Sequence, residues 1–226
     1  MERRFVRRIE LTGPIDRDSY LHGVPAVRFL EQTGVLEFRS GVTFLVGENG
    51  VGKSTLLEAV AVACGFNPEG GSRNFSFSTK ATHSALGDAL TVVRSAYPKD
   101  GFFLRAESFY NAASYLDALD EIPALAEKLS GGYGGSLHEK SHGESFLALV
   151  QNRFRGHGLY LLDEPEAALS PMRLLTLMGE IDRLLETGSQ FIISTHSPIL
   201  MAFPGAEVLE ITGAGISAVP YRETEH

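Results

Sequence analysis

The chain has a single cysteine, Cys64, among its 226 residues. One thiol cannot form an intramolecular disulfide, which excludes a disulfide-stabilised scaffold. No apolar run approaches the roughly 18 residues that a membrane-spanning helix needs, and residues 1–8 lack the apolar core of a signal peptide. We therefore expect a cytoplasmic protein in which Cys64 is an ordinary core residue.

Positive charge is also scarce. The chain has 28 acidic and 20 basic residues, a formal net charge of −8. So acidic a chain is not suited to coating nucleic acid along its whole surface, although a local basic patch can exist within it. Its one basic cluster is Arg3, Arg4, Arg7 and Arg8. We interpret this cluster as the solvated face of a strand.

A glycine-rich segment carries the strongest signal in the chain. Residues 47–55 read GENGVGKST and match the phosphate-loop pattern G-x-x-x-x-G-K-[ST]. Residues 42–46 before it are β-branched and aromatic, as in a buried strand, and residues 54–64 after it favour a helix. This is the strand, loop and helix context that the pattern requires, so we expect the chain to bind a nucleoside triphosphate.

The chemistry of this loop follows from the start of a helix, where backbone N–H groups lack partners and attract phosphate. Glycines at three positions let those donors converge on the phosphates. Lys53 would reach the β- and γ-phosphates, and the Ser54 hydroxyl would bind Mg²⁺. The expected nucleotide-binding residues are Gly47, Glu48, Asn49, Gly50, Val51, Gly52, Lys53, Ser54 and Thr55.

A second apolar run, residues 158–162, ends in Asp163-Glu164-Pro165. This is typical of a buried parallel strand with two carboxylates at its carboxyl end, the edge where ligands bind in open α/β sheets. Asp163 would hold Mg²⁺, directly or through water, and Glu164 would orient and deprotonate an attacking water. The same residues are also an ordinary helix-start signal. The phosphate loop favours the catalytic interpretation.

A third strand is expected over residues 190–195, closing on His196. Residues 171–186 suggest a helix, which gives room for a right-handed return to the sheet. His196 would then arrive at the same edge as the phosphates, where it could sense the γ-phosphate. A histidine at a strand end is otherwise a structural residue.

A competing motif, residues 138–142, reads HEKSH and matches the zinc-protease pattern H-E-x-x-H. That chemistry needs a continuous helix through both histidines. Glycines at 131–135 and at 143 make such a helix unfavourable. We therefore interpret the match as coincidental.

These motifs, in this order, resemble those of the ABC-type ATPases, especially soluble ones akin to the heads of SMC and RecF-like proteins and small AAA-family ATPases with an ABC signature. Residues 47–55 look like the Walker A motif, and 159–164 look like Walker B with its catalytic glutamate. Residues 166–170 look like the D-loop, and His196 is similar to the switch histidine. The resemblance implies Mg²⁺-dependent binding and hydrolysis of ATP.

Further roles are implied by the resemblance alone. Ser141 and Gly143 look like the part of the ABC signature that caps the ATP of a partner subunit, although His142 replaces the first glycine of Leu-Ser-Gly-Gly-Gln. Glu107 stands where the Q-loop glutamine would bind near the metal. Tyr20 is similar to the aromatic residue that stacks on adenine. The metal-site residues implied are thus Ser54, Asp163 and Glu107.

The expected fold is α/β, a P-loop NTPase with a mainly parallel central sheet, an antiparallel β part and an inserted helical lobe. A single domain would span residues 1–226, with a core from 1–65 and 158–226 and a mainly helical lobe over 66–157. No heptad array is visible, so the long coiled coil of SMC proteins is absent.

The expected function is ATP hydrolysis by a homodimer that sandwiches ATP and switches a partner. That partner could be a nucleic acid or nuclease, although the net charge does not indicate nucleic acid. Two alternatives remain open at this point. One is the ATPase subunit of a membrane transporter, which would need a separate permease, and the other is a slow ATP-binding switch that recruits an unknown protein.

Overall fold

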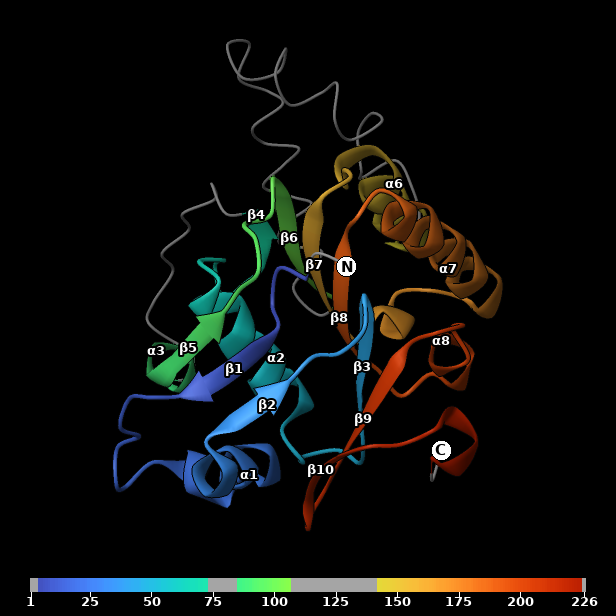
Figure 1. The fold of residues 1–226 in the computed structure, drawn as a ribbon. Helices are drawn as coiled ribbons and strands as arrows, with labels where there is room; N and C mark the ends of the chain where they lie inside the picture. The colour runs from blue at the N-terminus through green and yellow to red at the C-terminus, as the bar shows by residue number, and fades with distance from the viewer. Residues whose placement is uncertain (1–3, 73–84, 107–141, 225–226) are drawn as a thin grey trace.

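The computed structural model describes residues 4–72, 85–106 and 142–224. A seven-stranded sheet in the order β10-β9-β3-β8-β7-β6-β4 forms its centre (Figure 1). The five middle strands are parallel, and β4 and β10 at the two edges are antiparallel to their neighbours. The strands are β3 Val42–Val46, β4 Gly71–Ser72, β6 Asp100–Arg105, β7 Gly158–Asp163, β8 Gln190–Ser194, β9 Glu207–Thr212 and β10 Gly215–Ala218. The mainly parallel α/β sheet expected from the sequence is confirmed.

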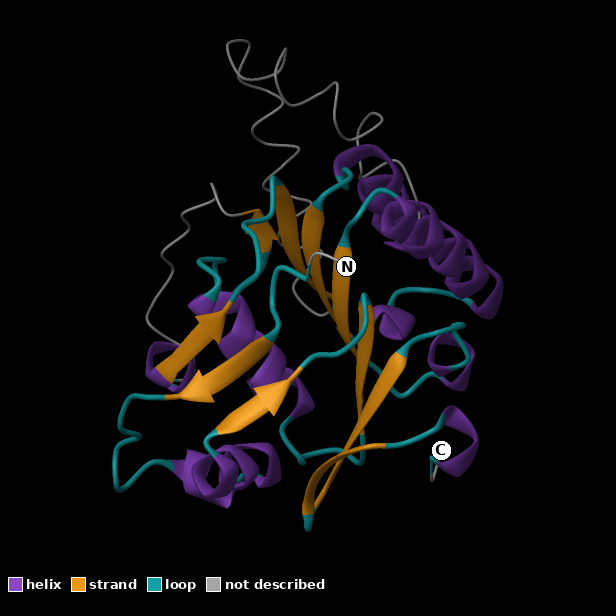
Figure 2. Ribbon diagram, in the orientation of Figure 1, coloured by secondary structure: helices purple, strands orange, loops and turns teal. Residues whose placement is uncertain are grey.

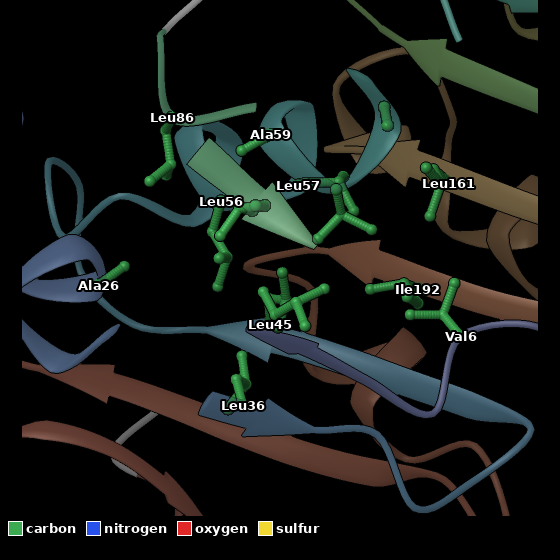
Figure 3. Packing of buried hydrophobic residues seen from close by; sticks show 14 of the residues in the cluster. Val6, Ala26, Leu36, Leu45, Leu56, Leu57, Ala59, Leu86, Leu161 and Ile192 are labelled. Carbon is green, nitrogen blue, oxygen red and sulfur yellow. The ribbon is translucent and has the colours of Figure 1, made fainter. Parts of the chain in front are cut away.

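A smaller antiparallel sheet supplies the expected second β part. Its order is β2-β1-β5, with β1 Arg8–Leu11, β2 Val35–Glu37 and β5 Leu90–Val93. The phosphate-loop helix α2, Lys53–Ala63, shares one buried apolar cluster with this sheet and with one face of the central sheet. Figure 3 shows Leu56 and Leu57 of α2 in this cluster with Leu45 of β3. Cys64 is buried in the same cluster, as expected.

The other face of the central sheet is covered by α6 His142–Arg153, α7 Pro171–Glu186 and α8 Pro198–Met201. Side chains alternate between the two faces, as the pleat of a strand requires. Phe44 and Tyr160 pack on the α6 and α7 side, whereas Leu45 and Leu161 pack on the α2 side. The helices on both sides of the sheet can be followed in Figure 2. Because both faces are covered, the middle strands are apolar along their whole length.

The shorter elements complete the chain. The segment between β1 and β2 folds into η1 and α1. The bounds are η1 Tyr20–Gly23, α1 Pro25–Thr33, α3 Leu86–Ala89, η2 Pro165–Ala167 and η3 Tyr221–Glu223.

The predicted division into core and helical lobe stays a prediction. Part of the range assigned to the lobe, 66–157, instead contributes strands, because β6 pairs with β7 and β5 pairs with β1. Residues 107–141 lie outside the described part of the chain. Within the described residues, no helix combines the length and apolar character needed to cross a membrane.

Candidate active site

The phosphate loop joins β3 to α2 through glycines whose backbone no other residue adopts easily. Gly47, Gly50 and Gly52 have φ angles of 137°, 83° and 99°. A Cβ on Gly47 would lie 2.3 Å from the carbonyl oxygen of Ile211, and one on Gly52 would lie 2.3 Å from Cγ1 of Val24. The loop therefore needs glycine at positions 47 and 52 both for conformation and for space, and at position 50 for conformation alone.

Lys53 is the first residue of α2, and its side chain folds back over the loop. Its Nζ donates to the carbonyl oxygens of Gly47 at 2.8 Å and Glu48 at 2.9 Å. Burial lowers the pKa of Lys53, and the charges of Glu164, Asp163 and Glu166 oppose that shift. Three carboxylates, at the end of β7 and directly after it, thus favour the charged form of the phosphate-loop lysine.

Asp163 ends β7 and is buried. Its Oδ1 accepts a short hydrogen bond from the Ser194 hydroxyl of β8, and its Oδ2 lies 3.3 Å from Nε of Arg105. Arg105 also reaches Oε2 of Glu58 on α2, at 2.6 Å from its Nη1. Arg105 thus ties β6, β7 and α2 together behind the loop.

The donor set suits Mg²⁺. Asp163 and Ser54 offer hard oxygen ligands. In the described part of the chain, no group of three or more His, Cys, Asp or Glu residues is arranged to hold a metal ion.

Glu164 follows Asp163 in a left-handed conformation with φ 48°. Its N–H donates to the Ser194 carbonyl oxygen at 3.1 Å, which fixes this unfavourable backbone against β8. Non-glycine residues held in this region concentrate at functional sites. The conformation brings one Glu164 carboxylate oxygen to 3.7 Å from Nε2 of His196. The two residues predicted to be catalytic are therefore neighbours.

A pocket of about 150 Å³ lies where these elements meet. It is lined by Val24, Asn49, Gly50, Gly52, Lys53, Ser54, Thr55 and Glu164. Val24 directly precedes α1. The N–H of Ala26 in α1 donates to the Val51 carbonyl oxygen of the phosphate loop at 3.0 Å, so the start of α1 contacts this loop. No sequence motif pointed to Val24. Tyr20, expected to stack on adenine, is 71% exposed and is not among the lining residues, so its role stays a prediction.

Two predicted residues, Ser141 and Glu107, lie outside the described residues, as do residues 138–141 of the zinc-protease pattern. Gly143 is in the first turn of α6 and is buried. A Cβ there would lie 2.9 Å from the Ala168 carbonyl oxygen and 2.7 Å from Nη1 of Arg173. Gly143 therefore packs directly on Ala168 of the segment that resembles the D-loop.

Comparisons with known proteins agree with this geometry. A family model described as an AAA domain matches residues 26–99, and a second AAA-domain model, whose description adds a candidate AbiEii toxin of a type IV TA system, matches residues 122–202. The cytochrome c biogenesis ATP-binding export protein CcmA of Roseobacter denitrificans is 26% identical, over 79% of this chain and 85% of its own. The vitamin B12 import ATP-binding protein BtuD of Yersinia enterocolitica is 29% identical, over 68% and 66%.

Solved structures show the same fold. CbiO1 from Clostridium perfringens, part of an ABC transporter complex, matches with a TM-score of 0.53 and 16% identity, over 97% of this chain and 90% of its own. MJ1267, an ATP-binding cassette of an ABC transporter, matches with a TM-score of 0.50 and 18% identity, over 96% and 90%.

Taken with the glycine loop, the buried lysine and the paired carboxylates, this fold defines a P-loop nucleotide-binding domain. The order of its motifs and its sequence relatives narrow the class further. The chain is similar in sequence to AAA-domain and ABC-type ATP-binding proteins.

Proposed function

We propose that the chain hydrolyses ATP as a head-to-tail homodimer, with Mg²⁺, and that the cycle of closing and opening switches a partner. The observation that carries this proposal is the meeting of three chain segments at one edge of the sheet. Lys53, Glu164 and His196 come from loops after three parallel strands, and the last two are 3.7 Å apart. Such convergence is where α/β sheets bind ligands.

Each residue has a role in the chemistry. Glu164 accepts a proton from the attacking water, and His196 beside it contacts the terminal phosphate. The Lys53 ammonium and the loop N–H groups neutralise the phosphate charge. Ser54 and Asp163 would hold Mg²⁺, which would supply further charge stabilisation at the phosphates.

The homodimer follows from the signature segment. Ser141 and Gly143 of one subunit would complete the pocket of the other, so that the same surface is used twice and the dimer closes with two-fold symmetry. The γ-phosphate is then shared by both subunits. Its loss on hydrolysis removes the contacts that differ between the closed and open states, and the dimer opens.

Glu164→Gln tests this cycle. Gln cannot take the proton, so steady-state hydrolysis should fall by roughly 10²-fold or more while ATP still binds. With ATP and Mg²⁺ the variant should accumulate as a dimer, measured by light scattering after size exclusion. Glu186→Gln at the exposed end of α7 is the control and should behave as the wild type. Unchanged turnover in Glu164→Gln would reject Glu164 as the base, and a protein that stays monomeric with ATP would reject the sandwich.

A second candidate function is the ATPase subunit of a membrane transporter. It is favoured by the names of the relatives, which are ATP-binding proteins of export and import systems. Purification of the Glu164→Gln protein with ATP from a membrane fraction separates the two candidates. Recovery with a polytopic membrane protein supports the transporter subunit. Hydrolysis that DNA stimulates in a salt-sensitive way supports a nucleic-acid partner instead.

A further inference from the structure

A third acidic residue, Glu166, stands two positions after Glu164 and has no part in the proposed cycle. It lies on η2, the short turn of helix that follows β7. Its side chain crosses to the next strand of the sheet, where Oε1 accepts a hydrogen bond of 2.5 Å from the backbone N–H of His196. Glu166 therefore contacts the histidine that faces Glu164.

This contact lies just beyond the last backbone hydrogen bonds between β7 and β8. The register of β7 and β8 ends at the pair Asp163 and Ser194, and Glu164 N still reaches Ser194 O at 3.1 Å. His196 lies beyond that point, where β8 has ended. The Glu166 carboxylate takes the place of a strand neighbour and holds the backbone of His196 at the sheet edge.

The two glutamates hold His196 from two sides. Glu166 binds its backbone N–H, and Glu164 faces its ring with Oε1 at 3.7 Å from Nε2. A histidine with a fixed backbone has only its side-chain torsions left to vary. The direction of its ring is then set by the same short segment that carries the proposed base.

The other carboxylate oxygen of Glu166, Oε2, is buried inside the protein. It finds no hydrogen-bond partner among the residues that the structure describes. An unpaired buried carboxylate oxygen is unfavourable and calls for an explanation. The negative charge of Glu166 also favours the charged form of Lys53 and so raises the pKa of Lys53.

We propose that Glu166 is a positioning residue for His196: by holding the His196 backbone N–H it fixes the imidazole between the Glu164 carboxylate and the terminal phosphate. The inference rests on the proposed role of His196 in hydrolysis. In this proposal Glu166 orients a catalytic group and makes no contact of its own with ATP.

The first experiment is a double-mutant cycle in the full-length chain with Glu166→Ala, His196→Ala and the double variant. Glu166→Ala should lower kcat about 10- to 100-fold, because a small misplacement of a catalytic group has effects of that size. The KM for ATP should change less than about twofold. In the His196→Ala background, Glu166→Ala should lower kcat less than about twofold further, since residues that act as one unit are not additive. An undiminished effect in that background overturns the proposal.

Glu166→Gln separates the hydrogen bond from the charge. Its amide oxygen can still accept from His196 N–H, so kcat should stay within about fivefold of the wild type. A loss as large as that of Glu166→Ala would mean that the negative charge, and not the contact with His196, carries the effect. This outcome would also overturn the proposal.

A readout independent of turnover covers the case in which His196 itself is dispensable. The imidazole signals of His196 are assigned in NMR spectra by their absence from His196→Ala. They should shift or broaden in Glu166→Ala and remain near their wild-type positions in Glu166→Gln. If His196→Ala hydrolyses ATP at the wild-type rate, the proposed role of His196 fails. Unaltered His196 signals in Glu166→Ala refute the positioning by Glu166.

Discussion

The two ends of the central parallel strands differ in how completely their polar groups are paired. We call the side of the sheet where these strands finish the carboxyl edge, and the side where they start the amino edge. At the carboxyl ends of the strands, Glu164 has a left-handed backbone, Glu166 keeps a buried oxygen without a partner among the described residues, and the Lys53 ammonium is buried against loop carbonyls. Each of these features is unfavourable for an empty folded chain. They are the features that a triphosphate and Mg²⁺ would use.

At the amino ends, the polar groups satisfy one another. The buried Tyr160 hydroxyl contacts Oδ2 of Asp100 at 2.8 Å, and Oδ1 of Asp100 binds Arg153 at 2.7 Å. The Tyr160 ring stacks on Phe154 with centroids 4.0 Å apart. This network joins the end of α6 to β6 and β7. His157, directly before β7, also has a left-handed backbone with φ 59°, so a positive φ by itself does not distinguish the two ends. The comparison indicates that the polar network at the amino ends is paired within the protein, whereas the carboxyl ends keep a buried Glu166 oxygen without a partner among the described residues, beside the proposed nucleotide site.

The largest expected effect that would test this contrast is at Lys53. Lys53→Ala should lower ATP hydrolysis by roughly 10²-fold or more, because the ammonium that neutralises the phosphates is lost. Thermal stability should hold or rise, since a buried cation in the empty site is removed. Steady-state hydrolysis and a thermal unfolding scan measure the two effects.

Lys99→Ala is the matched control, an exposed lysine at the amino edge, and it should change neither quantity. A clear drop in the melting temperature of Lys53→Ala would break the contrast. It would show that the carboxyl edge also depends on this residue for stability.

The sequence predicted the elements of both edges but the pairing of neither. Strand 42–46 and helix 171–186 have the bounds expected, because apolar runs and periodicity are local signals. Asp163, Glu164 and His196 could be proposed from the sequence because motifs at strand ends are also local, and their roles stay predictions. The bonds from Arg105 to Asp163, from Ser194 to Asp163 and from Glu166 to His196 depend instead on which strands become neighbours. The sequence alone does not specify which strands pair or in what register, so these long-range bonds could not be predicted.

The second effect concerns stability at the amino edge. Tyr160→Phe removes the hydroxyl and leaves Asp100 and the Arg155 backbone short of a partner. The free energy of unfolding should fall by about 1–3 kcal/mol. The kcat per folded molecule should stay within about twofold of the wild type, because the site lies at the opposite edge. Denaturant unfolding and a hydrolysis assay measure the two quantities, and a large loss of kcat would mean that the edges are coupled.

The pH dependence of stability tests whether the Tyr160 hydroxyl stabilises the fold at the amino edge. Burial, with help from Asp100, raises the pKa of Tyr160 well above the ordinary value of 10.0. The unfolded chain therefore releases this proton first as the pH rises, and stability is lost above about pH 10 by up to about 1.4 kcal/mol per pH unit from this group. Tyr160→Phe should lack this part of the decline. Parallel declines for the two proteins in urea unfolding between pH 9 and 11 would contradict the assignment.

The smallest effect is expected at a partly exposed ion pair beside the signature segment. Arg173 Nη2 lies 2.9 Å from Oε1 of Glu144, and the two side chains are 33% and 53% exposed, so Arg173→Ala should lower the free energy of unfolding by less than about 1 kcal/mol. Arg173 also packs on Gly143, so kcat should fall by about two- to fivefold if α6 completes the partner's pocket. Arg183→Ala, which breaks an i,i+3 pair with Glu180 on the same helix, is the control and should leave kcat unchanged. Equal kcat values for the two variants would show that the packing of Arg173 on Gly143 has no part in catalysis.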